Sequence, residues 1–93
     1  MPHVLIIHEV AAYPAWKAIF DRAAGMRKAA GEISYQLLRN DRECHAIVHF
    51  SHWTSLQAAR DFFESPALEA IRHEAGVITP EFIYLNEIEH KTL

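Results

Sequence analysis

The hydrophobic and polar positions change their period once in the first third of the chain. Residues 3–10 (HVLIIHEV) are mostly apolar and rich in β-branched side chains, which predicts a strand with two apolar faces. From Pro14 onward, apolar residues recur every three or four positions along one stripe. They are Trp16, Ile19, Ala23, Met26 and Ala30. This period predicts a helix that begins at the proline and ends at Gly31 in a left-handed conformation.

Two further extended segments, residues 33–40 and 44–51, flank a short polar stretch in the middle of the chain. Two such runs around so short a connection predict a β-hairpin. With Asp41-Arg42 as the loop, Tyr35 faces Val48 and Ser34 faces His49. In this register one face of the hairpin is apolar and the other is mixed, so we prefer it to a register shifted by one residue.

The last third predicts a helix in two parts and then a final strand. Thr54 and Gln57 form a capping-box pattern ahead of an amphipathic segment that runs to about residue 64. Ser65-Pro66 then restarts the helix, with serine as N-cap and proline in the first turn, and Gly76 ends it. Residues 81–89 follow a proline and predict a strand at the edge of a sheet.

The predicted order of elements is β-α-β-β-α-β. This is the α+β ferredoxin-like arrangement, with a four-stranded antiparallel sheet, helices on one face and a split second helix. We expect one domain over residues 1–93, with 90–93 as a loose tail. The first and last strands are apolar on both faces, so something must cover the second face of the sheet. A second copy of the same sheet is the simplest cover, which predicts a homodimer.

Composition narrows the classes of partner. The net charge is −3 with no basic stripe, so nucleic acid is not an expected partner. The longest apolar run, residues 4–7, is too short to span a bilayer, and the N-terminus lacks the pattern of a signal peptide. The single Cys44 cannot form an intramolecular disulfide. We therefore expect a cytoplasmic protein without a membrane partner.

Histidines are concentrated in the segment HAIVHFSHW, which holds His45, His49 and His52. On a strand, His45 and His49 are separated by about 13 Å, too far for one metal ion, and no carboxylate or cysteine completes a ligand set. A metal site is therefore not predicted. One interpretation is that His45 and His49 are half-buried and bind Ser34, Gln36 or water. The functional hypothesis is that one of them, together with His8, accepts a proton near neutral pH.

Several short motifs carry a family resemblance over nearly the whole chain. They are Trp16 early in the first helix, Arg27 to Gly31 at its end, Ala59-Arg60, Ser65-Pro66 and Gly76-Val77. In these motifs the chain resembles the antibiotic biosynthesis monooxygenase superfamily of dimeric α/β-barrel proteins. The resemblance implies a homodimer with a pocket for a small aromatic or polyketide-type compound, which better-known members oxidise with molecular oxygen and no cofactor. A haem-degrading branch has an asparagine on the first strand where this chain has His8, so haem is not expected.

A cofactor-free oxygenase needs a base, polar groups for the substrate oxygens and a dry aromatic pocket. The candidate bases are His8 and His49. The candidate hydrogen-bonding groups and walls of the pocket are Tyr35, Tyr84, Asn86, Trp16, Phe50, Trp53 and Phe63. Each aromatic residue also has a packing interpretation, with Trp53 stapling the start of a helix. Arg27 flanks the core stripe and could pair with a carboxylate or face a ligand, and we prefer a surface ion pair. The alternative function is therefore a non-catalytic small-molecule-binding or stress-related dimeric barrel protein.

Overall fold

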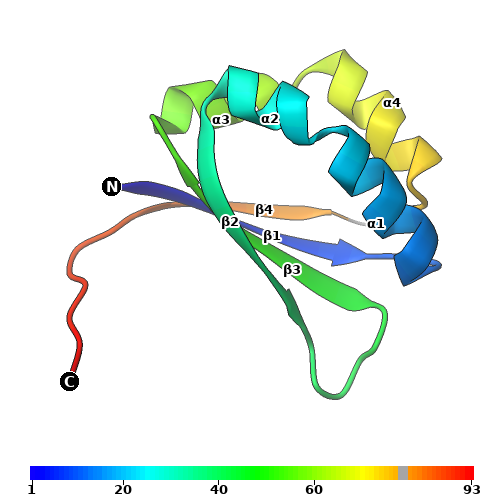
Figure 1. Ribbon diagram of the computed structural model, residues 1–93, viewed down its shortest axis with the longest axis horizontal. Coiled ribbons are helices and arrows are strands. Elements are labelled where there is room, and N and C mark those ends of the chain that lie inside the picture. Colours follow the sequence, from blue (N-terminus) through cyan, green and yellow to red (C-terminus); the bar gives the residue numbers. More distant parts are fainter. Residues whose placement is uncertain (78–79) are drawn as a thin grey trace.

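The computed structural model describes residues 1–77 and 80–93. The elements, in chain order, are β1 (Pro2–Glu9), α1 (Tyr13–Arg22), α2 (Ala24–Ala30), β2 (Glu32–Arg39), β3 (Ala46–Trp53), α3 (Leu56–Phe63), α4 (Pro66–Glu74) and β4 (Glu81–Asn86). The strands form one antiparallel sheet in the order β2-β3-β1-β4, and the helices lie on one face of it (Figure 1). This confirms the α+β ferredoxin-like fold, with β4 at an edge. After Asn86 the chain runs away from the sheet (Figure 1).

The long first helix is interrupted where the sequence predicted it to be continuous. Ala23, with φ −85° and ψ 0°, separates α1 from α2. Gly31 ends α2 at φ 127°, a conformation that favours glycine, as predicted. A Cβ at Gly31 would lie 2.6 Å from Oγ1 of Thr54, whose backbone N–H donates to the Gly31 carbonyl oxygen at 2.9 Å. The end of the first helical segment is therefore pinned to the end of β3.

The second helical segment is split at the predicted position. Ser65 is the N-cap of α4, accepting from the backbone N–H of Leu68 at 3.4 Å, and a proline occupies the first turn. At α3 the expected cap was wrong by one residue. Ser55 is the N-cap and accepts from the N–H of Ala58 at 3.0 Å, because Thr54 is held by Gly31. Within the described part of the chain, no helix is long and apolar enough to cross a membrane.

The hairpin of β2 and β3 is present, but its predicted register is wrong by three residues. Leu37 pairs with His49, and Tyr35 pairs with Ser51 rather than Val48. The connection is longer than two residues because Asn40 Oδ1 accepts from the backbone N–H groups of Arg42 and Glu43, at 2.9 and 3.2 Å. The offset is an odd number of residues. Each β2 side chain therefore shares a face of the sheet with the β3 side chains that the predicted register had placed on the other face.

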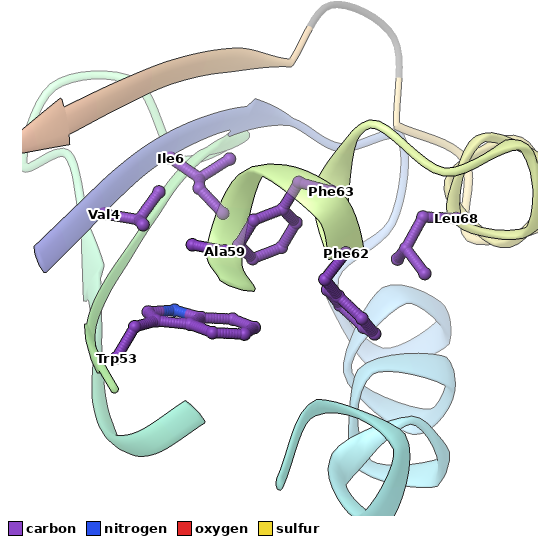
Figure 2. Packing of buried hydrophobic residues seen from close by; sticks show 7 residues of the cluster. All are labelled: Val4, Ile6, Trp53, Ala59, Phe62, Phe63 and Leu68. Atoms are coloured by element: carbon purple, nitrogen blue, oxygen red, sulfur yellow. The ribbon is translucent and has the colours of Figure 1, made fainter. Parts of the chain in front are cut away.

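The two faces of the sheet differ in what covers them. The face toward the helices holds the core, in which Trp53 lies against Phe63 of α3 with ring centroids 5.2 Å apart (Figure 2). The other face, here called the open face, carries the alternate strand positions. Its apolar residues are Leu5, Ile7, Leu38, Val48, Phe50, Ile83 and Leu85. Leu38, Ile83 and Leu85 are 48%, 37% and 38% exposed, so much of this apolar surface is in water in a single chain.

Candidate active site

A small cavity lies between the sheet and the helices. Its walls are largely apolar and include five aromatic rings, those of Trp16, Phe20, Phe62, Phe63 and Phe82. The polar residues that line it are His8 on β1, His49 on β3, Arg27 on α2 and Arg72 on α4. The cavity has a volume of about 50 Å³. An apolar cavity of about 150 Å³ holds benzene, so in this conformation the cavity has room for water but not for an aromatic ring.

Beside the cavity, three charged or polar side chains form a buried network. Arg27 donates from Nε to Glu32 Oε1 at 2.8 Å and from Nη1 to the carbonyl oxygen of Phe20 at 2.7 Å. His49 Nε2 lies 2.8 Å from Glu32 Oε2. None of the side chains of Arg27, Glu32 and His49 is more than 6% exposed. The expectation of a surface ion pair for Arg27 was therefore wrong, because its guanidinium packs 3.7 Å from the centroid of the Phe20 ring and its partner is buried with it.

The network determines which ring nitrogen of His49 holds the hydrogen shared with Glu32. Burial raises the pKa of Glu32, but hydrogen bonds from His49 and Arg27 outweigh it, so the pKa of this carboxyl is lowered. Glu32 is therefore ionised at neutral pH and can only accept hydrogen bonds. Nε2 of His49 must then carry the hydrogen that Glu32 accepts. In a neutral imidazole this leaves Nδ1 as the proton acceptor, which is the tautomer a general base needs.

His8 is the second histidine of the cavity. It pairs with Ile47, so it is a diagonal neighbour of His49 on the same face of the sheet. Burial, together with the nearby His49 and Arg72, lowers the pKa of His8 from 6.5 to about 3, and the imidazole is neutral at physiological pH. His8 is therefore suited to a hydrogen bond and is a weak base.

Two polar atoms of the cavity residues lack partners. Nδ1 of His8 and Nη2 of Arg27 are buried and make no hydrogen bond to any residue in the ranges 1–77 and 80–93. The side chains are held in place, since His8 is 6% and Arg27 3% exposed. An unsatisfied buried donor or acceptor costs about 1–3 kcal/mol, so these atoms favour a bound polar group.

The structure brings together four of the residues proposed from the sequence, namely His8, His49, Trp16 and Phe63, all of which line the cavity. Two others face the helices elsewhere. Trp53 is fully buried in the core, where it packs with Ala59 and Phe63 of α3, and it donates from Nε1 to Ser51 Oγ at 2.8 Å. Tyr84 packs against the same core, with the guanidinium of Arg60 4.8 Å from its ring centroid.

The remaining three candidates lie outside the cavity. Tyr35 is 44% exposed and meets the ring of His49 edge-on at 5.6 Å, while it lines a separate surface groove beside α2. Phe50 and Asn86 lie together in another groove, at the end of the open face. The odd shift in register explains why Phe50 lies outside the cavity. The positions of β3 that face the helices are Ile47, His49 and Ser51, and Phe50 is on the other face.

The three histidines of HAIVHFSHW do not converge. His45 is exposed on the loop side and lies 3.1 Å through Nδ1 from the carbonyl oxygen of Val10. His49 is 1% exposed and bound to Glu32, so the expected contacts with Ser34 or Gln36 were wrong. His52 stacks on His3 with centroids 4.9 Å apart. Among the residues that the structure describes, no group of three His, Cys, Asp or Glu side chains is placed to hold a metal ion.

Arg27, Glu32 and Arg72 were missed as site residues. A signal for Arg27 was present, because it follows Ala23 by four positions and so falls on the inward stripe of the first helix. An arginine on an apolar stripe needs a buried partner, and Glu32 directly follows the glycine that ends the helix. The pair could therefore have been proposed from sequence. Glu32 in contact with His49 could not, because that contact depends on the register of β2 and β3.

Comparison with solved structures shows which proteins share this fold. The structure is similar to that of SnoaB, a cofactor-independent oxygenase from Streptomyces nogalater, with a TM-score of 0.76 and 18% identity over 96% of this chain and 94% of that one. It is also similar to the monooxygenase ActVA-Orf6 of Streptomyces coelicolor, solved with the ligand nanaomycin D, with a TM-score of 0.67 and 16% identity over 99% and 91% of the two chains. At these identities the likeness concerns the fold.

The sequence itself gives a more specific result. No curated protein matches the chain. The model of the family described as antibiotic biosynthesis monooxygenase matches residues 12–74, which run from the start of α1 to the end of α4 and include Arg27, Glu32 and His49. The chain therefore belongs to the antibiotic biosynthesis monooxygenase family.

Proposed function

We propose that this protein is a cofactor-independent monooxygenase that oxidises a small aromatic compound with molecular oxygen. The observation that carries the proposal is the aromatic-walled cavity lined by His49, whose tautomer is fixed by the buried Glu32. Membership of the family and the likeness in fold to a cofactor-independent oxygenase support the same reaction class.

In the proposed reaction, His49 acts as the base. Its unprotonated nitrogen takes the proton of a phenol or enol hydroxyl, and the resulting anion is rich enough in electrons to react with oxygen. A carbon–oxygen bond forms at the activated ring carbon and gives a peroxide, which takes back the proton. Loss of water then breaks the O–O bond and leaves a carbonyl group. One oxygen atom enters the substrate, the other leaves as water with two substrate hydrogens, and oxygen is the only oxidant.

Dimer formation is the second part of the proposal. The open face exposes apolar side chains on all four strands, and large apolar patches rimmed by polar residues mark interaction surfaces. Nε2 of His52, on the same face, is buried without a hydrogen-bond partner in the described part of the chain. A second copy of the sheet would cover the apolar residues and supply polar groups beside His52.

The size of the cavity limits how a substrate enters. An aromatic ring does not fit into about 50 Å³. Binding therefore requires side chains of α1 and α4 that line the cavity, such as Ile19 and Ile71, to move outward. The two helices are joined at the surface by an ion pair between Arg22 and Glu74 at 3.2 Å, with both side chains mostly exposed. Exposed pairs of this kind are weak, so little energy opposes a separation of the helices.

Oxygen uptake tests the proposal. The purified protein is offered a panel of phenols, quinols and anthrones, and products formed under ¹⁸O₂ are analysed by mass spectrometry. We expect uptake with one class of compound and incorporation of one labelled atom. His49→Ala should lower turnover at least a hundredfold, in the range of a lost general base, while the matched control His73→Ala, on the exposed side of α4, should not. Absence of uptake with every class, or equal turnover in the two variants, would contradict the proposal.

A second candidate is a non-catalytic small-molecule-binding protein. The observation that favours it is that the lining residues Trp16, Phe63 and Leu68 all belong to the hydrophobic core, so each has a structural role that requires no catalysis. The two functions differ in one readout. A binding protein takes up an aromatic ligand without consuming oxygen, whereas the monooxygenase consumes one molecule of oxygen for each product formed.

A further inference from the structure

The wall of the cavity carries an unbalanced charge. Arg27 and Arg72 both line it, together with two histidines, and no aspartate or glutamate is found among its described lining residues. Glu32 is near but does not line the cavity, and its two oxygens are already bound, one to Arg27 and the other to His49. Arg27 therefore has a carboxylate partner, whereas the carboxylate that acts on Arg72, that of Glu69 on the same helix, lies outside the described lining of the cavity.

Both guanidiniums are fixed in position and keep capacity for a ligand. Arg72 donates from Nη1 to the carbonyl oxygen of Phe63 at 3.0 Å and lies 5.1 Å from the ring centroid of Phe82. Burial lowers the pKa of Arg72, the direction expected for a partly desolvated cation. Arg27 keeps Nη2 free of hydrogen bonds to any residue that the structure describes, at 3% exposure. A buried cation with an unpaired donor is costly, so binding of a hydrogen-bond acceptor there is favourable.

We propose that the cavity binds its aromatic ligand as an anion, with the charged oxygen accepting from Nη2 of Arg27 near Arg72, and a second ligand oxygen hydrogen-bonded to Nδ1 of His8. Phenolate, enolate and carboxylate share this chemistry. The inference rests on the proposed function in one respect, since the bound anion is the form that reacts with oxygen there. It assigns Arg27 and Arg72 to recognition, whereas the base remains His49.

A ligand bound in this way gives a hydrogen-bond partner to Nη2 of Arg27 and to Nδ1 of His8, and brings a negative charge near Arg72. An anionic oxygen on a guanidinium forms a charge-assisted hydrogen bond, roughly twice as strong as a neutral one. It also supplies the negative charge that Arg72 lacks among the described lining residues. A neutral ligand of the same shape would fill the cavity but leave Nη2 of Arg27, which belongs to a buried cation, without a charged acceptor. The cavity should therefore discriminate by charge more than by shape.

Anaerobic titration at pH 7 tests the preference for an anion, because it measures binding without turnover. The probes are salicylate and its neutral counterpart 2-hydroxybenzyl alcohol, and the readout is calorimetry together with the fluorescence of the tryptophans. We expect salicylate to bind at least tenfold more tightly. Equal affinity of the two compounds, or no binding of salicylate, would overturn the proposal.

Two arginine variants form a matched pair for the same titration. Arg72 and Arg60 each stack on an aromatic side chain of β4, but only Arg72 lines the cavity. Arg72→Gln should reduce the preference for salicylate to less than threefold, while Arg60→Gln should leave it unchanged. Loss of the preference in both variants, or in neither, contradicts the placement of the anion.

Arg27 is tested by a conservative change and by a measurement on the unaltered protein. Arg27→Lys keeps a cation beside Glu32 but has no second terminal nitrogen, so salicylate affinity should fall at least tenfold. Where that variant does not fold, the guanidinium ¹⁵N resonances of the native protein give the same information. Those of Arg27 should shift on addition of salicylate and those of Arg60 should not, and the reverse result overturns the assignment.

The two proposals can fail separately. Oxygen uptake with a neutral compound, together with no preference for salicylate, would retain the monooxygenase and reject the anion site. Tight, charge-dependent binding of salicylate without oxygen uptake on any phenol would retain the anion site and reject the monooxygenase.

Discussion

The two faces of the sheet carry histidines in very different settings. On the face toward the helices, His8 and His49 are 6% and 1% exposed, and His49 is bound to an ionised carboxylate. On the open face, His3 and His52 are half-buried and stack on each other, and His3 also stacks on Phe50 at 5.1 Å. The first pair lines the small cavity between the sheet and the helices, and the second lines a separate groove.

The difference shows that the neighbours of a histidine decide what it can do. Imidazole titrates near neutral pH by itself, so its role depends on burial and on the partner of each nitrogen. Glu32 selects one tautomer of His49, and burial keeps His8 neutral. Nδ1 of His3 lies 3.1 Å from the carbonyl oxygen of Met1, and this contact is exposed to solvent. We infer that acid–base chemistry belongs to the helix side and subunit contact to the open face.

The largest expected effect comes from removing the charge that organises the helix side. Glu32→Ala leaves the guanidinium of Arg27 buried without its carboxylate, and breaking a buried ion pair in this way costs about 3–5 kcal/mol. Urea unfolding followed by circular dichroism measures the loss. The matched change on the open face, His52→Ala, should cost less than about 1 kcal/mol. Similar losses for the two variants would remove the distinction between the faces.

The next effect concerns the open face alone. Phe50→Asp places a charge on the proposed dimer surface, and we expect the dissociation constant of the dimer to rise at least a hundredfold, equivalent to about 2.7 kcal/mol. Sedimentation equilibrium measures it, and circular dichroism checks the fold. Phe50→Leu is the control and should remain dimeric. If the aspartate variant also stays dimeric, the subunit contact lies elsewhere.

An acid-dependent effect should follow from His8. Its pKa is about 3 in the folded protein against 6.5 as the ordinary value, so between these values the unfolded chain binds more protons and stability falls as the pH falls. Lowering the pH from 7 to 5 should cost about 2 kcal/mol through this group. The lowered pKa of Glu32 adds a loss only below about its ordinary value of 4.5, outside this interval.

The matched variants for this pH effect are His8→Asn and His3→Asn. The difference in unfolding free energy between pH 7 and pH 5 should shrink by about 2 kcal/mol in the first variant and stay unchanged in the second. An undiminished pH dependence in His8→Asn would show that this histidine is not the group responsible.

The smallest effect should be the interaction between the stacked histidines of the open face. A double-mutant cycle with His3→Ala and His52→Ala should give a coupling of about 0.5 kcal/mol, the low end for stacked rings. The same cycle on Glu32 and His49 should give at least twice that value, because one partner is charged and both are buried. Equal coupling energies would show that burial does not make the interaction of Glu32 with His49 stronger than that of the two stacked histidines.

The sequence predicted the fold well because each element carries its own local signal. Pro14, Gly31 and Ser65-Pro66 mark helix ends through backbone conformation and capping, which depend on a few adjacent residues. The break at Ala23 had no such signal, since alanine favours a continuous helix.

The candidate site was predicted only in part, because its central contact is not local. His8, His49, Trp16 and Phe63 could be proposed from residue type and from the faces of their elements. The contact of His49 with Glu32 could not, since it depends on a register set by the Asn40 turn and by the irregularity between Glu32 and Ser34. Phe50 was proposed for the cavity because the predicted register placed it wrongly, whereas Asn86 lies at the end of β4, outside this hairpin. An error of three residues in one hairpin therefore exchanged the interior and exterior of β3.

Gly31 has a consequence for the order of folding. It reverses the chain so that Arg27 and Glu32, five residues apart, form their ion pair with a very short loop, whereas the contact of Glu32 with His49 spans 17 residues. The entropy of loop closure favours the shorter contact first. We therefore expect the arginine and glutamate to meet while water still surrounds them, so that β3 brings the histidine to a carboxylate whose charge is already balanced when the core closes.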